Sequence, residues 1–159
     1  MREQARTKEP KGAFLLKRDF AVAVKAVIIK ENKALVLCRS KHEMECSYMN
    51  SHQKWDLPGG GLHFFEKAEE GLRREIREET DLHVSIGPPL SLFDAIKHHI
   101  HLCIFTYACT WTGGEVRLSP EHEAFFWMTE EEMEESELPH WMKRDIRAAF
   151  ASLRKKQEG

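Results

Sequence analysis

The sequence lacks the features that mark membrane-spanning, disulfide-rich and disordered proteins. No apolar run approaches the roughly 18–20 residues that a membrane-spanning helix needs, and the stretch from Ala21 to Ile29 is interrupted by Lys25. The 159 residues include only 4 cysteines, too few for a disulfide framework in a chain of this length. The first residues are charged and lack the apolar core of a signal peptide, so we expect a cytoplasmic protein.

An excess of charge of one sign is also missing. The chain has 24 Lys and Arg against 26 Asp and Glu, which gives a formal net charge of −2. This balance excludes attraction of the whole surface to nucleic acid or to acidic membranes, so we expect neither a nucleic-acid polymer nor a membrane as partner. With 42% hydrophobic and 31% charged residues, the composition is that of a soluble domain long enough to bury a core.

The hydrophobic pattern predicts one mixed α/β domain. Residues 66–80 have apolar side chains four residues apart, which is typical of a helix, and strand-like stretches lie on both sides of it. We expect residues 1–17 to form a flexible extension and residues 40–54 a long irregular surface loop. Strands are expected over Phe20–Ile29, Ala34–Cys38, Leu82–Ile86, Leu90–Ile96, Ile100–Trp111, Glu115–Leu118 and His122–Met128, and further helices after the capping residue Thr129 and over Trp141–Leu153.

The predicted helix over residues 66–80 carries an acidic face beside its apolar one. Glu75, Glu78 and Glu79 fall within an arc of about 100°. The charges of Glu75 and Glu79 repel one another, and the helix dipole disfavours all three near the C-terminal end. A divalent cation would reverse both penalties, and carboxylates are ligands that suit Mg²⁺ or Mn²⁺. The helix therefore predicts a metal site for a phosphorylated ligand, and a solvated acidic face stays open as the alternative.

A longer pattern contains this helix. The segment from Gly60 to Leu82 has the form G-x5-E-x7-R-E-I-x-E-E-x-D-L, which resembles the Nudix box of the MutT-like Nudix hydrolases at eight of its nine specified positions. The one departure is Asp81, where the box has glycine. Helices often end on a left-handed residue, and aspartate tolerates that conformation better than most, so we expect a local cost in stability and no loss of chemistry. The resemblance implies an α/β/α sandwich with a mixed sheet, as a single Nudix domain over residues 18–157.

The resemblance also implies a reaction and a set of metal ligands. Nudix hydrolases cleave a nucleoside diphosphate linked to another group X, which makes a small-molecule nucleotide the substrate and Mg²⁺ or Mn²⁺ the cofactor. By motif position, Glu78 and Glu79 would be the main metal ligands, and the Gly60 carbonyl often adds one. Glu75 would be a ligand or the general base, and which glutamate is the base stays open. Members of the family often use one more acidic residue from a downstream loop. Of the candidates Glu121 and Glu123 we favour Glu121, and an exposed loop carboxylate stays open as the alternative.

Other residues would position these groups or contact the substrate. Arg74 would orient the catalytic glutamates by ion pairing, and Glu66 would fix the loop and the start of the helix. Arg39 could meet a phosphate, Phe64 could stack on a base, and His99 could contact the substrate from its strand. Surface solubility, lid packing and a solvent-facing strand, respectively, explain these three residues equally well or better. The roles of the 40–54 loop and of the cluster His98–His101 stay open.

The substrate class is suggested by subfamily markers that the sequence lacks. Residues that mark ADP-ribose pyrophosphatases, diadenosine polyphosphate hydrolases and coenzyme A-specific members are absent at their usual spacings, which leaves a nucleoside triphosphate or a related nucleotide. A catalytically silent nucleotide-binding Nudix domain is one alternative. An enzyme similar to isopentenyl diphosphate isomerase is another, which would need a catalytic cysteine such as Cys38 or Cys46. A homodimer also stays open, since members of the family are often dimers.

Overall fold

The computed structural model describes residues 19–47, 52–97 and 99–159, which contain both strands and helices. The predicted extension over residues 1–17 lies outside these described residues, as do part of the 40–54 loop and His98. The strands are β1 (Asp19–Lys30), β2 (Lys33–Arg39), β3 (Trp55–Asp56), β4 (Gly59–Gly61), β5 (His83–Lys97), β6 (Ile100–Gly113) and β7 (His122–Met128). The helices are α1 (Lys41–Cys46), α2 (Ala68–Thr80), α3 (Glu130–Glu135) and α4 (His140–Glu158).

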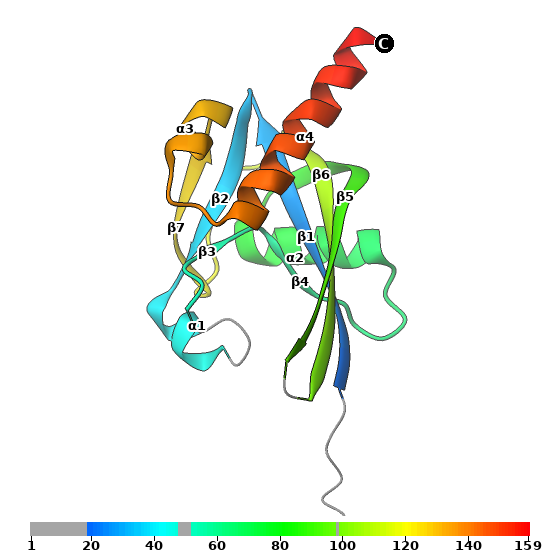
Figure 1. The fold of residues 1–159 in the computed structure, drawn as a ribbon, viewed down its shortest axis with the longest axis vertical. Helices are drawn as coiled ribbons and strands as arrows, with labels where there is room; N and C mark the ends of the chain where they lie inside the picture. Colours follow the sequence, from blue (N-terminus) through cyan, green and yellow to red (C-terminus); the bar gives the residue numbers. More distant parts are fainter. Residues whose placement is uncertain (1–18, 48–51, 98) are drawn as a thin grey trace, which may run out of the picture.

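The strands of the described residues form one 7-stranded mixed sheet (Figure 1). Its main order is β3-β2-β1-β6-β5, and β4 pairs with β1 while β7 pairs with β2. The central strands β1 and β6 run parallel, and the pairs β1–β2 and β5–β6 are antiparallel. This arrangement confirms the predicted α/β class and the mixed sheet.

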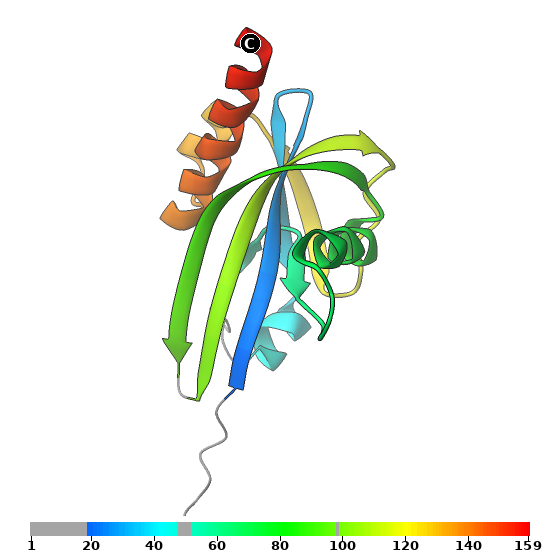
Figure 2. The same cartoon turned by 90° about the vertical axis from the view of Figure 1, so that its right-hand side faces the viewer.

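Helices cover both faces of the sheet because the apolar side chains of β1 alternate between them. Val24, Ala26 and Ile28 pack in one core cluster with Leu72 and Ile76 of α2. Val27 and Ile29 of β1 face the other way and join a second cluster with α4 and the residues around α3. Figure 2 shows α2 and α4 on opposite sides of the sheet. The layers are therefore helix, sheet and helix, as expected.

The expectation of an irregular loop over residues 40–54 is wrong in its first part, where α1 forms. Ser40 caps this helix, and its side-chain oxygen accepts a hydrogen bond from the backbone N–H of Glu43 at 3.1 Å. The sequence contains the signal, because Ser40-x-x-Glu43 has the spacing of a capping box. The polar composition of the segment favours a loop, and the helix has no buried residue that would give it an apolar pattern.

Two strand expectations also need correction. The stretches Leu82–Ile86 and Leu90–Ile96 belong to the single strand β5, which continues through Gly87-Pro88-Pro89 with shifts in register. Prolines fit there because β5 is at the edge of the sheet. The stretch Glu115–Leu118 is not a strand. The backbone N–H of Arg117 bonds to the Thr80 carbonyl at 2.9 Å, so this segment covers the end of α2 instead of completing a hairpin.

Candidate functional site

The helix α2 is tied to the loop before it by Arg74. The guanidinium of Arg74 donates to both carboxylate oxygens of Glu66, at 2.7 and 3.0 Å, and to the Gly61 carbonyl at 3.1 Å. It also donates to Glu75 at 2.7 Å and to Glu78 at 3.3 Å. These hydrogen bonds lower the pKa of Glu66 to about 2, with the Arg74 contact as the largest cause and the His63 N–H as the next. The pairing of Arg74 with Glu78 agrees with the one-turn spacing in the sequence.

The helix starts two residues later than expected and ends as expected. It begins at Ala68 and not at residue 66, because Glu66 is used in the loop, where its carboxylate accepts the His63 backbone N–H at 3.0 Å. At the other end, Asp81 is left-handed with φ 60° and ψ 18°, and its N–H donates to the Arg77 carbonyl at 3.0 Å. Asp81 therefore performs the turn for which the box normally has glycine.

Two glycines bring the β4 loop against the acidic face of α2. Gly59 has φ 139°, and a Cβ there would lie 2.0 Å from the Val24 carbonyl oxygen. A Cβ on Gly60 would lie 2.7 Å from the Glu75 carboxylate. The backbone N–H of Gly59 donates to Glu79 at 2.9 Å. Because these two positions have no side chain, the loop backbone can approach the glutamate carboxylates closely.

Glu79 is the most buried of the three acidic residues of the helix, with an exposed fraction of 4%. Burial raises its pKa to about 8, against the opposing effects of the Lys25 charge and the Gly59 N–H, while the Asp56 and Glu121 charges add to the rise. Glu75 is half-buried, whereas the Glu78 side chain is 58% exposed. A buried carboxylate with like charges nearby needs either a proton or a cation.

Lys25, Asp56 and His122 form a buried polar cluster under this acidic region. Lys25 donates to Asp56 at 2.8 Å and to the carbonyls of Leu57 and Gly59, both at 3.1 Å. Burial works against both charges. The Asp56 and Glu79 charges outweigh it and raise the pKa of Lys25, while Lys25 and His122 lower the pKa of Asp56. His122 Nε2 lies 3.2 Å from the second Asp56 oxygen.

This cluster was not predicted from the sequence, although one signal was present. Lys25 is the single charge inside an apolar strand, and such a residue is rarely buried without a partner. The sequence around Asp56 and His122 contains no comparable signal, because the partner of each residue is distant in the sequence.

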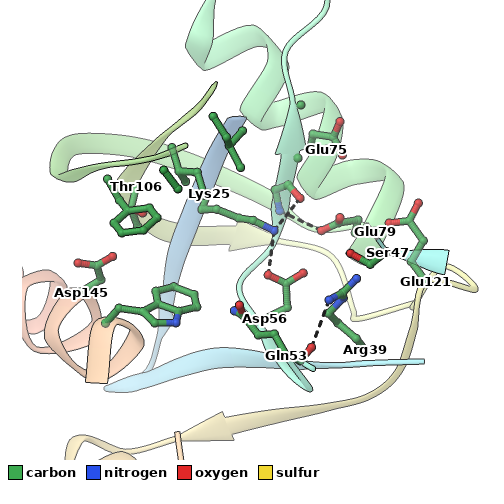
Figure 3. Close-up of a pocket in the computed structure, with 18 of the residues that line it drawn as sticks. Lys25, Arg39, Ser47, Gln53, Asp56, Glu75, Glu79, Thr106, Glu121 and Asp145 are labelled. Atoms are coloured by element: carbon green, nitrogen blue, oxygen red, sulfur yellow. Dashed lines mark hydrogen bonds and ion pairs between the residues drawn. The ribbon is translucent and has the colours of Figure 1, made fainter. Parts of the chain in front are cut away.

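These groups line a cavity of about 640 Å³. In Figure 3, Glu79 and Glu121 lie on one side of Lys25, and Thr106 and Asp145 lie on the other. The wall contributed by β5, β6 and α4 has apolar side chains, among them Phe93, Ile104 and Trp141, and the charged side chains of Lys97, Arg144 and Asp145. The cavity therefore has an acidic end and an end where aromatic and charged side chains lie together, which suits a ligand with a phosphate part and a ring part.

The structure brings some of the predicted site residues together and leaves others apart. Those that line the cavity are Gly60, Glu75, Glu79, Glu121 and Arg39. Among the described residues, Glu78, Phe64 and His99 are not part of the lining. Glu66 and Arg74 lie behind it and hold the helix and loop together. The assigned roles of all these residues stay predictions.

Glu121 reaches the acidic end because the loop before β7 is held at both sides. The Ser119 N–H donates to the Glu79 carbonyl at 3.1 Å, and the Glu121 carbonyl accepts the Ser40 N–H at 2.8 Å. One ligand atom each from Glu79, Glu121 and His122 lie within 4.8 Å of one another. Two carboxylates and an imidazole at this spacing are a donor set that fits a divalent cation.

The weaker histidine candidates lie elsewhere. His101 pairs with Asp94 at 3.1 Å, and His99 lies 3.7 Å from Asp19, while His98 is outside the described residues. Neither described pair lines the cavity. Among the described helices, none is both long and apolar enough to cross a membrane.

Comparison with known proteins gives consistent matches. A family model described as the NUDIX domain matches residues 19–150. A MutT-like protein from Streptomyces ambofaciens is 30% identical over 115 residues, which cover 72% of this chain and 68% of that protein. Nucleoside triphosphatase NudI from Escherichia coli is 32% identical over 91 residues, which cover 50% of this chain and 64%, or slightly under two thirds, of the relative. The crystal structure of a MutT protein from Methanosarcina mazei matches with a TM-score of 0.69 and 26% identity, covering 86% of this chain and 97% of that one.

Proposed function

The chain belongs to the Nudix family of hydrolases, and we propose that it cleaves the pyrophosphate bond of a nucleoside diphosphate linked to another group, with a nucleoside triphosphate as the favoured class. The observation that carries the proposal is the convergence of Glu75, Glu79 and Glu121 on one end of a single cavity. The similarity to a protein named as a nucleoside triphosphatase supports this substrate class. The domain proposed for this activity spans residues 18–157.

The donor set fits the divalent cation that the family implies. Mg²⁺ and Mn²⁺ take oxygen ligands, and the proposed ligands are the carboxylates of Glu75, Glu78, Glu79 and Glu121 with the Gly60 carbonyl. When bound, the cation neutralises the pyrophosphate and lowers the pKa of a bound water. Lys25 holds Asp56 and the Gly59 carbonyl in place at this end of the cavity.

The protein's own residues would position the substrate and take up the proton. Arg74 holds Glu75 and the loop in one geometry, and the backbone of Gly59 holds Glu79. One of these glutamates accepts the proton of the attacking water, and Glu75 is the proposed base or ligand. The end of the cavity lined by Trp141 and Phe93 provides a surface for the ring part of a nucleotide.

The isomerase alternative receives no support from the cavity. That chemistry needs a cysteine beside the reacting carbon. Cys38 is buried and Cys46 is exposed on α1, and no cysteine of the described residues lines the cavity. The silent binding domain remains the alternative to test.

A product-release assay tests the proposal. The full chain is incubated with a panel of nucleoside triphosphates, dinucleotides and nucleotide sugars, with Mg²⁺, with Mn²⁺ and with a chelator, and the products are separated by ion exchange. We expect turnover that the chelator abolishes and added metal restores, with the triphosphates cleaved fastest. Binding of metal and nucleotide without turnover of any compound would contradict the hydrolase and favour a binding domain.

A further inference from the structure

The imidazole of His122 has one nitrogen engaged and the other without a partner. The residue is 5% exposed, and its Nε2 lies 3.2 Å from Asp56. Its Nδ1 is buried and has no hydrogen-bond partner among the described residues. Asp56 is an ionised carboxylate that only accepts, so the Nε2 atom carries the hydrogen. Nδ1 therefore presents a lone pair to its surroundings.

The buried ammonium of this cluster offers the lone pair no hydrogen. One ligand atom each of Glu79, Glu121 and His122 lie within 4.8 Å of one another. Because Nε2 of His122 is engaged with Asp56, Nδ1 is the ring atom with a lone pair free to bind a cation. The ammonium of Lys25 has three hydrogens, and its three contacts go to Asp56 and to the Leu57 and Gly59 carbonyls. The buried cation of the cluster is thus fully used elsewhere.

We propose that His122 Nδ1 is a nitrogen ligand for a divalent cation that is shared with Glu79 and Glu121. Asp56 would then be the carboxylate behind the imidazole, which fixes its tautomer and the orientation of its ring, as in other carboxylate–histidine–metal arrangements. The inference rests on the proposed function only in placing a cation at the acidic end of the cavity. It adds a ligand that the Nudix box does not contain.

A nitrogen ligand changes which ion is preferred. Mg²⁺ binds oxygen donors and is weakly held by imidazole, whereas transition ions such as Mn²⁺ and Co²⁺ accept mixed nitrogen and oxygen sets. We therefore expect the full chain to bind Mn²⁺ more tightly than Mg²⁺, and we expect this preference to depend on His122.

The direct test is electron spin-echo spectroscopy of Mn²⁺ alone bound to the full chain. We expect modulation from a histidine nitrogen, which changes to the ¹⁵N pattern when histidine is labelled with ¹⁵N. His122→Gln removes the modulation, and His101→Gln, at an exposed pair outside the cavity, retains it. Mn²⁺ bound without any histidine nitrogen modulation would overturn the proposal, and so would a modulation that survives in His122→Gln.

Affinities provide a second readout that does not depend on turnover. In metal titrations followed by the free Mn²⁺ signal, we expect His122→Gln to weaken Mn²⁺ binding by about tenfold or more, with a smaller effect on Mg²⁺. If this buried variant does not fold, the presence or absence of ¹⁵N-histidine modulation in the unchanged chain decides the question. An equal loss of affinity for Mn²⁺ and Mg²⁺ would overturn the proposal. Metal-dependent hydrolysis would survive that result, so the two failures are distinguishable.

Discussion

Arg74 fixes the position of the loop before α2 relative to the acidic face of that helix, because it bonds to both. Its guanidinium contacts three glutamates and a backbone carbonyl at once, which requires a planar fork with several hydrogens. A lysine keeps the charge and lacks the fork. The directions of its hydrogen bonds therefore matter more for the role of Arg74 than its charge does.

Arg74→Lys should lower kcat/KM for the best substrate by about 100-fold, because small displacements of catalytic groups have effects of that size. The matched control is Arg73→Lys, the neighbouring exposed arginine, whose guanidinium donates to the Val84 carbonyl. Steady-state kinetics with both variants check this expectation. Equal activity in Arg74→Lys and Arg73→Lys would contradict the positioning role.

At the scale of elements, the turn between β4 and α2 contains a backbone conformation that its residue does not favour. Phe65 has φ 63°, which is unusual for a bulky side chain, and its side chain is fully exposed. Burial therefore offers no compensation for the unfavourable backbone. The turn is held by Glu66, which accepts the His63 N–H and the Arg74 guanidinium.

Phe65→Gly should raise the free energy of unfolding by about 0.5–1 kcal/mol, because relief of the left-handed conformation exceeds the extra freedom of glycine in the unfolded chain. Phe64→Gly is the control. Phe64 is equally exposed but lies outside the left-handed region, so this change should give no gain. Urea denaturation of both variants measures the difference. A loss of stability in Phe65→Gly would show that the aromatic side chain has contacts that outweigh the backbone cost.

At the scale of the whole molecule, the buried ion pair of Lys25 and Asp56 joins β1 to β3, and His122 extends it to β7. The side chains of Lys25 and Asp56 are 17% and 13% exposed. The pKa of Asp56 is lowered on folding, since its pairing with Lys25 and His122 outweighs its burial. A carboxyl with a lowered pKa stabilises the fold above its unfolded pKa of about 3.9, and this stabilisation is lost as the pH falls through the folded value.

Asp56→Asn should therefore destabilise the protein by about 3 kcal/mol at pH 6, where it leaves the Lys25 charge buried without its partner. The difference in the free energy of unfolding between Asp56→Asn and the unchanged chain should become smaller as the pH falls below about 4. Lys25→Met combined with Asp56→Asn should cost less than Asp56→Asn alone, because no unpaired charge remains. Urea denaturation between pH 3 and pH 6 gives these free energies of unfolding. A difference between Asp56→Asn and the unchanged chain that does not depend on pH would contradict the stabilising role of the ion pair.

The sequence predicts the parts of this molecule whose causes are local. The helix over the box, the left-handed end at Asp81 and the capping of α3 by Thr129 and Glu132 all depend on residues within a few positions of one another. The buried cluster does not, because Asp56 pairs with Lys25 and His122 at separations of 31 and 66 residues. Only the order of strands in the sheet brings those side chains together.

The measurement that tests the central claim most directly compares Glu79→Gln with Glu70→Gln. Both residues lie on α2, but Glu79 is buried at the acidic end of the cavity, and Glu70 is exposed in the first turn. With saturating Mg²⁺ and the best nucleotide substrate, Glu79→Gln should lower kcat by about 1,000-fold, which corresponds to the several kcal/mol expected of a cation-stabilised transition state. Glu70→Gln should match the unchanged chain. Turnover by Glu79→Gln within a few-fold of Glu70→Gln would contradict the claim that this carboxylate cluster is the catalytic centre.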